Sequence, residues 1–219
     1  MTNLKKSITQ LFDNWARTTN HKGNIFIKDG IIDYELWNNS QLKIVFLLKE
    51  AYGNEIPNKW DLSSYINNKR KASGRTFKPL GQWAYGIFGL YEKEFIHPFP
   101  TKTNQQDINK ALSSCALVNI KKSGGKKRSN HNNLNEYLEN DWGYLSEQLD
   151  LIEPQIIICG KTWDLIKKKL NGYEKVSDQV YKHDGRYYVD YWHPANRASK
   201  IMNYYALCAL IQQSNILEA

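Results

Sequence analysis

Two segments far apart in the chain each join an apolar run to side chains capable of acid–base chemistry. The first run, residues 45–48, leads directly into Lys49 and Glu50. The second, residues 188–192, leads into His193 and Pro194. Both have the form of a buried strand that ends in polar, turn-forming residues. Because the carboxyl ends of strands in an open α/β sheet border the ligand crevice, we expect a carboxylate and a histidine at one sheet edge.

Two further apolar runs lie between them, one ending near Asn119 and one ending at Gly160. Segments with helical periodicity separate the four runs, and this alternation is typical of a mostly parallel sheet covered on both faces. We predict one parallel sheet with strands near residues 43–48, 115–120, 155–159 and 187–192. We predict helices over residues 3–17, 60–70, 79–91, 104–114, 134–149, 161–170 and 197–213. Asp-Gly pairs predict hairpins within residues 24–37 and 178–192.

Composition and charge limit the class of protein. The 219 residues fit one domain, with a net charge of +8 from 30 basic and 22 acidic residues. Basic residues cluster in 69–78 and 121–128, which favours a polyanionic partner. The sequence has no apolar run of about 18 residues and no secretory signal, so we expect no membrane span and a cytoplasmic location.

Several familiar catalytic motifs fail on spacing. Gly160-Lys161-Thr162 resembles the end of a phosphate-binding loop, but Gln155 stands where that motif needs glycine. The zinc deaminase, HExxH and GxSxG patterns are absent from the sequence. The three cysteines are isolated in apolar or helical patterns, as buried reduced thiols are: Cys115, Cys159 and Cys208. We therefore expect neither a metal nor a cofactor.

Taken in order, the four strand ends resemble the motifs of the uracil-DNA glycosylase superfamily. Glu50-Ala51-Tyr52-Gly53 with Glu55 looks like the Gly-Glu-Ala-Pro-Gly motif and further acid of its iron–sulfur branch. Leu117-Val118-Asn119 is similar to the strand that ends in a base-reading asparagine, and Lys122 keeps an Asn-x-x-Lys spacing. Ile158-Cys159-Gly160 and His193-Pro194-Ala195 resemble the Leu-Gly and His-Pro-Ser motifs. The resemblance covers about residues 43–213.

The chain departs from the family pattern at defined positions. Lys49 replaces a glycine, Tyr52 a proline and Ala195 the serine of the His-Pro-Ser motif. The cysteines that hold the iron–sulfur cluster are also missing.

The resemblance implies a three-layer α/β/α sandwich with a central four-stranded parallel sheet, forming a single domain over residues 1–219. It also implies catalytic roles for Glu50, which positions water, and His193, which hydrogen-bonds the departing base. Asn119 would read the base edge, Tyr52 would contact substrate, and an aromatic side chain would stack on the flipped base. The stacking candidates are Phe77 and Trp83. The candidates for nucleic-acid contacts are Lys122, Lys126, Lys127, Arg128 and Arg197.

Several of these residues also have a structural interpretation. Asn119 could cap a turn, Phe77 and Trp83 could be core residues, and residues 126–128 could form a solvated loop. Our leading interpretation is a monomeric, metal-free DNA glycosylase that flips and removes a base from single- or double-stranded DNA. The alternatives are a nucleic-acid or modified-base binding protein with a degenerate site, and a hydrolase of free nucleotides or nucleosides.

Overall fold

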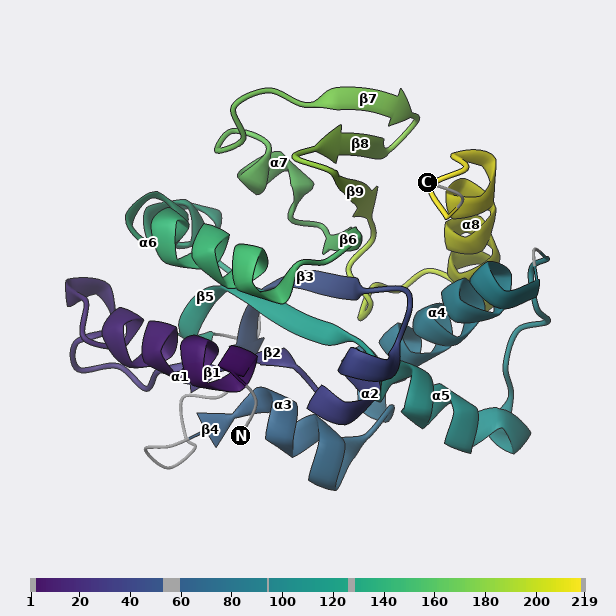
Figure 1. Ribbon diagram of the computed structural model, residues 1–219, viewed down its shortest axis with the longest axis horizontal. Coiled ribbons are helices and arrows are strands. Elements are labelled where there is room, and N and C mark those ends of the chain that lie inside the picture. Colours follow the sequence, from purple (N-terminus) through teal and green to yellow (C-terminus); the bar gives the residue numbers. More distant parts are fainter. Residues whose placement is uncertain (1–2, 53–59, 94, 126–128, 218–219) are drawn as a thin grey trace.

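A seven-stranded mixed sheet flanked by helices forms the centre of the molecule (Figure 1). The computed structural model describes residues 3–52, 60–93, 95–125 and 129–217. Across the sheet the strands are β2 (Gly30–Ile31), β5 (Ala116–Gly125), β3 (Ile44–Tyr52), β6 (Ile156–Gly160), β9 (Arg186–Tyr191), β8 (Val180–His183) and β7 (Glu174–Ser177). Two short strands, β1 (Ile27–Lys28) and β4 (Trp60–Asp61), pair separately in parallel.

The four predicted strands are neighbours in this sheet, in the order β5-β3-β6-β9, and each pairs in parallel with the next. The expected sheet of four strands was nevertheless too small. Strand β2 adds an antiparallel edge beside β5, and β8 and β7 extend the other edge in antiparallel pairing. The sequence did not indicate β2 because it has two residues, or β7 because its four residues lack an apolar run.

Of the two predicted hairpins, one is confirmed. Strands β8 and β9 pair across Asp184 and Gly185, whose φ values of 47° and 74° suit a two-residue hairpin turn. The prediction of a hairpin around Asp29 and Gly30 is wrong, because β1 pairs with β4 whereas β2 pairs with β5. Long-range pairing therefore decided the conformation of that segment.

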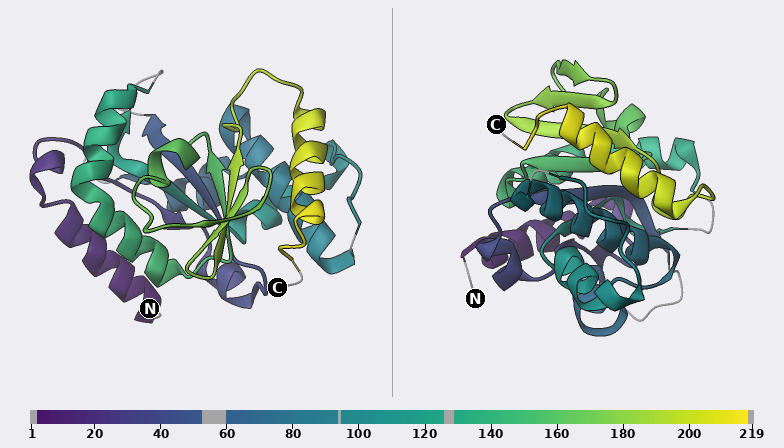
Figure 2. Two further views of the ribbon diagram at one scale, coloured as in Figure 1. Left: turned by 90° about the horizontal axis from the view of Figure 1, so that it is seen from above. Right: turned by 90° about the vertical axis from the view of Figure 1, so that its right-hand side faces the viewer.

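Helices cover both faces of the sheet, and its strands alternate their side chains between the two cores (Figure 2). One core packs under α4 (Gly74–Lys93), α5 (Gln105–Ser113) and α8 (Lys200–Gln213). The other packs under α1 (Asn3–Trp15), α6 (His131–Ile152) and α7 (Trp163–Ile166). The smaller helical elements are α2 (Tyr34–Asn39), α3 (Leu62–Tyr65), η1 (Thr19–His21), η2 (Ile66–Arg70) and η3 (Lys102–Asn104).

Several element boundaries differ from those predicted. Helix α4 begins at Gly74 rather than at Pro79, which lies inside the helix, and α7 covers less than the predicted 161–170. Strands β3 and β5 run beyond the predicted residues 48 and 120. Glu50 and Asn119 consequently lie within strands, not beyond their ends. In the parts of the chain that the structure describes, no helix combines the length and apolar character needed to span a bilayer.

Candidate active site

The order of the parallel strands reverses between β3 and β6. The chain passes from β3 to β5 on one side, then returns to β6 and β9 on the other side. At such a reversal of strand order the connecting segments separate, and open α/β sheets bind their ligands there. Lys49 and Glu50 lie near the end of β3, Gly160 ends β6, and His193 follows β9 at this edge.

His193 is held as a neutral ring with one defined tautomer. The backbone N–H of Ala195 donates a 3.2 Å hydrogen bond to its Nδ1. Nδ1 is therefore the acceptor, and the ring proton resides on Nε2. Burial lowers the His193 pKa to about 4, and the nearby charges of Lys49 and Lys200 act in the same direction. At neutral pH this side chain is an uncharged Nε2–H donor.

The turn that carries His193 is braced by residues that the sequence analysis did not single out. Asn196 donates from its backbone N–H and its Nδ2 to the His193 carbonyl, at 3.0 and 2.8 Å. Lys200 Nζ donates to the carbonyls of Pro194 and Asn196 at 2.9 and 2.8 Å. Asn203 Nδ2 donates to Asn196 Oδ1 at 3.0 Å, which ties the turn to α8. The available sequence signal was an asparagine three residues after His193, typical of a turn.

Gly160 and Thr162 bring the ends of β3, β6 and β9 into close contact. A Cβ on Gly160 would lie 2.4 Å from Leu48 Cδ2 and 3.5 Å from Pro194 Cδ, so a glycine lets β3 and the His193 turn approach β6. The Thr162 hydroxyl donates to the Leu47 carbonyl at 2.9 Å from a fully buried position. The Gly-Lys-Thr segment rejected as a phosphate-binding loop thus braces the sheet edge.

Glu50 lies at this edge but is paired with a lysine of the neighbouring strand. Its Oε2 is 3.4 Å from Lys121 Nζ, and the Lys121 and Glu50 side chains are only 11% and 6% exposed. Lys121 also donates to Asn133 Oδ1 at 2.7 Å. Gly125 packs directly against Glu50, since a Cβ there would lie 2.3 Å from Glu50 Cδ. The carboxylate is therefore enclosed and its charge is balanced by protein.

Asn119 and Lys122 belong to a buried polar cluster, and Lys122 is therefore not placed to contact nucleic acid. The backbone N–H and Nδ2 of Asn119 donate to Asp29 Oδ2 at 2.8 and 3.1 Å. Lys122, with no exposed surface, donates to Asp29 Oδ1 at 2.6 Å and to the Asn119 carbonyl at 2.8 Å. Gln148 completes the cluster by donating to Asp29 Oδ1. In this arrangement Asn119 donates one side-chain N–H and its backbone N–H to Asp29, and Lys122 is shielded from any phosphate.

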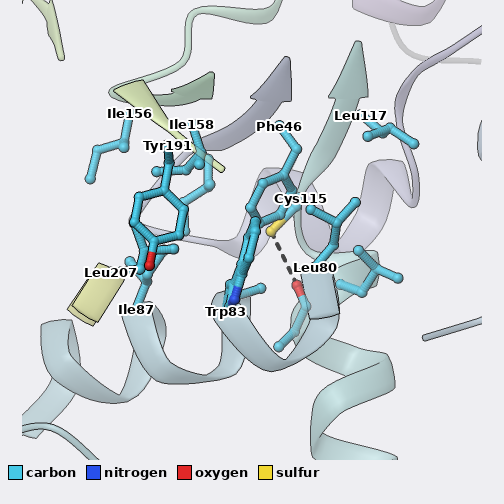
Figure 3. Packing of buried hydrophobic residues seen from close by; sticks show 14 of the residues in the cluster. Phe46, Leu80, Trp83, Ile87, Cys115, Leu117, Ile156, Ile158, Tyr191 and Leu207 are labelled. Atoms are coloured by element: carbon cyan, nitrogen blue, oxygen red, sulfur yellow. Dashed lines mark hydrogen bonds between the residues drawn. The ribbon is translucent and has the colours of Figure 1, made fainter. Parts of the chain in front are cut away.

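The two aromatic candidates for base stacking differ in burial: Trp83 lies in the core, and Phe77 is only half-buried. Trp83 is 2% exposed and packs edge-to-face on Tyr191 with ring centroids 5.3 Å apart, beneath the sheet and beside Phe46 (Figure 3). This burial excludes Trp83 as a stacking platform. Phe77 is half-buried in the first turns of α4 and packs against the same core, so it remains a candidate. Tyr52 is the last residue of β3, opposite Gly125.

A cationic groove opens beside the His193 turn. It has a volume of about 600 Å³ and lies between the start of α4 and the segment that follows His193. Its basic residues are Arg75, Lys78, Arg197 and Lys200, and none of the described residues that line it is acidic. Arg197, expected to contact nucleic acid, is exposed at this groove. Lys126, Lys127 and Arg128 lie outside the described residues.

Neither the cysteines nor a metal-binding cluster forms a competing centre within the described residues. Cys115, Cys159 and Cys208 are free and buried, as predicted, and burial raises the pKa of each thiol. No cluster of three or more His, Cys, Asp or Glu side chains among the described residues could hold a metal ion.

Neither the known protein-family models nor the curated proteins include a match to this chain.

Proposed function

We propose that the chain is an N-glycosidic-bond hydrolase that acts on a base of nucleic acid, with the three-layer fold of the uracil-DNA glycosylase superfamily. The observation that carries the proposal is the neutral, Nε2-protonated His193 at the carboxyl edge of a parallel sheet, beside a cationic groove. The ordered motif resemblance agrees with this placement.

The chemistry follows from where charge develops. Cleavage of an N-glycosidic bond leaves negative charge on the departing base and positive charge on the sugar. A fixed Nε2–H from His193 would stabilise the anion as a preorganised donor. Glu50 would orient water and favour the sugar cation once its carboxylate turns from Lys121 toward the substrate.

The groove supplies the remaining element of recognition. Its four cations lie next to the His193 turn and match the negative charge of a phosphate backbone. This placement supports a nucleic acid as substrate, because phosphate contacts would fix the register of the nucleic acid relative to His193.

A second candidate function is favoured by the state of Glu50 and Asn119. Glu50 is paired with Lys121, and Asn119 is bound to Asp29, so neither is free in this conformation. A protein that binds nucleic acid or a modified base without cleaving it would tolerate both arrangements.

The test measures abasic-site formation in oligonucleotides that carry uracil, hypoxanthine, xanthine or alkylated bases, in single and double strands. For a hydrolase we expect Glu50→Gln to lose most of the rate while retaining affinity, since the carboxylate acts on the transition state. His193→Ala should lose about 100-fold or more. Glu174→Gln and His183→Ala, on the β7–β8 edge of the sheet, are the matched controls.

The outcomes separate the candidates. Tight binding with no abasic product from any base would favour the non-cleaving binder. Release of base from free nucleosides or nucleotides, but not from oligonucleotides, would favour the hydrolase of small substrates. Equal loss of rate in the control variants would contradict the assignment of Glu50 and His193.

A further inference from the structure

A large aromatic side chain stands exposed immediately before His193. Trp192 is 52% exposed, although tryptophan side chains are usually largely buried in folded proteins. It lies outside β9, at the start of the turn that carries His193. The fold therefore presents an aromatic face beside the candidate catalytic residue.

A cation is placed against this ring. Lys161 Nζ lies 5.3 Å from the centroid of the Trp192 ring. Lys161 has a left-handed backbone, with φ of 63°, and its N–H donates to the Tyr191 carbonyl at 2.8 Å. The backbone at the end of β6 is thus fixed where its lysine can reach the indole.

The same turn separates Trp192 from the cationic groove. The Asn196 N–H bonds to the His193 carbonyl, so the chain reverses direction between Trp192 and Arg197. Arg197 then lines the groove together with Arg75 and Lys78 from the start of α4. An exposed aromatic side chain therefore directly precedes His193 in the chain, and groove residues follow it directly after the turn.

We propose that Trp192 and the cationic groove form a binding track for single-stranded nucleic acid. Phosphates lie against Arg75, Lys78 and Arg197, and an unpaired base stacks on the Trp192 indole beside Lys161. Stacking on aromatic side chains combined with a basic groove is how proteins hold single strands without reading sequence. This inference rests on the proposed function only in placing the reacting base at His193; binding along the track does not require cleavage.

A single strand fits this surface better than a duplex for a geometric reason. In a duplex both faces of each base are covered by its stacked neighbours, so an indole can stack only after a base leaves the helix. In a single strand the base faces are available, and Trp192 needs no prior opening. The track therefore sets a preference for unpaired substrate.

The experiment measures fluorescence anisotropy of a labelled oligonucleotide with only normal bases, as a single strand and as a duplex, over a range of salt concentrations. We expect the wild-type protein to bind the single strand more tightly. Trp192→Ala should weaken single-strand binding by about 5-fold or more, the scale of removing one base stack, and Trp192→Phe should retain most of it. Met202→Ala, at a 72% exposed apolar side chain on α8, is the control for general loss of apolar surface.

The groove is tested by a charge-matched pair of triple variants. Arg75→Ala with Lys78→Ala and Arg197→Ala should flatten the dependence of log K on log salt by about 2, because each phosphate neutralised on a single strand accounts for about 0.7 of the slope. Lys6→Ala with Lys22→Ala and Lys168→Ala removes the same charge from exposed positions outside the groove and should leave the slope nearly unchanged. These measurements use an oligonucleotide with only normal bases and require no cleavage. They therefore test binding along the track even if the protein has no hydrolase activity.

Three results would overturn the proposal: duplex bound more tightly than single strand, an unchanged single-strand affinity in Trp192→Ala, or equal slopes in the two triple variants. Absence of any nucleic-acid binding would overturn it as well.

Discussion

At the scale of single residues, His193 has a property that titration can test. Its pKa is lowered from 6.5 to about 4, so between these values the unfolded chain binds a proton that the folded protein does not. Stability therefore falls as pH decreases from about 6.5 to about 4. We expect His193→Gln to lose less stability than wild type over this range in urea unfolding at a series of pH values. Identical pH dependence in the two proteins would contradict the shift.

The tautomer of His193 gives an independent measurement. Nitrogen chemical shifts of the ring should report a neutral imidazole with its proton on Nε2 at pH 6, because Nδ1 accepts from the Ala195 N–H. Any dependence of activity on His193 protonation should appear near a pH of about 4, where the pKa of the folded protein lies. A cationic ring at pH 6 would be the contrary result.

Lys122 tests the cost of breaking a buried ion pair. Lys122→Met leaves Asp29 buried without its cation, and we expect a loss of about 3–5 kcal/mol of unfolding free energy. The control is Lys28→Met, which removes a lysine from the exposed pair with Asp13 and should cost about 0–1 kcal/mol. Urea denaturation measures both, and similar losses in the two variants would argue against the buried pair.

The sequence could indicate the position of His193 and Glu50 at the sheet edge, because each follows an apolar run that is visible locally. It could not assign Asn119 and Lys122, because the residue that binds both is Asp29, which is distant in the chain and has no local signature. The same limit applies to Trp83, because an aromatic residue in a helix has the same sequence pattern whether it packs inward or stands at a rim.

At the scale of elements, Gly160 lets β3 and the turn after β9 approach the end of β6 closely, because it has no side chain. Gly160→Ala would place a methyl group 2.4 Å from Leu48 Cδ2, and we expect a loss of about 1–3 kcal/mol through overpacking. Adding Leu48→Ala should relieve the clash, so the two changes should be strongly non-additive.

Gly143→Ala is a control that we expect to raise stability rather than lower it. Gly143 lies inside α6, and nothing lies within 4 Å of the place that an alanine methyl group would take, so alanine should stabilise the helix by about 0.5–1 kcal/mol. Thermal or urea unfolding of the two variants measures the contrast. Destabilisation by both changes would show that the clash at Gly160 is not the cause.

The strands that position the site were predictable because β3, β5 and β6 contain continuous buried apolar runs and β9 is largely aromatic and apolar. The edge strands β2 and β7 were not, since an edge strand needs little apolar character and its pairing depends on distant partners. The extension of β3 and β5 past Leu48 and Ile120 was hidden for a related reason. Polar residues there pair with each other across strands, as Glu50 does with Lys121.

At the scale of the whole molecule, the three thiols report on its integrity. Cys115, Cys159 and Cys208 are distributed over both cores, and burial raises the pKa of Cys208 to about 12. Since the thiolate is the reactive form, we expect none of the three to react with a thiol reagent in the folded protein and all three to react in denaturant. Rapid labelling of the native protein would show that a core opens under native conditions.

The central position of β3 has a consequence for synthesis on the ribosome. This strand begins at Ile44, but its two partners begin only at Ala116 and Ile156. At about 5–20 residues per second, an apolar strand with both edges unpaired waits several seconds for its first neighbour and longer for its second. The nascent chain therefore carries an aggregation-prone segment from early in synthesis until β5 and β6 have emerged to cover its two edges.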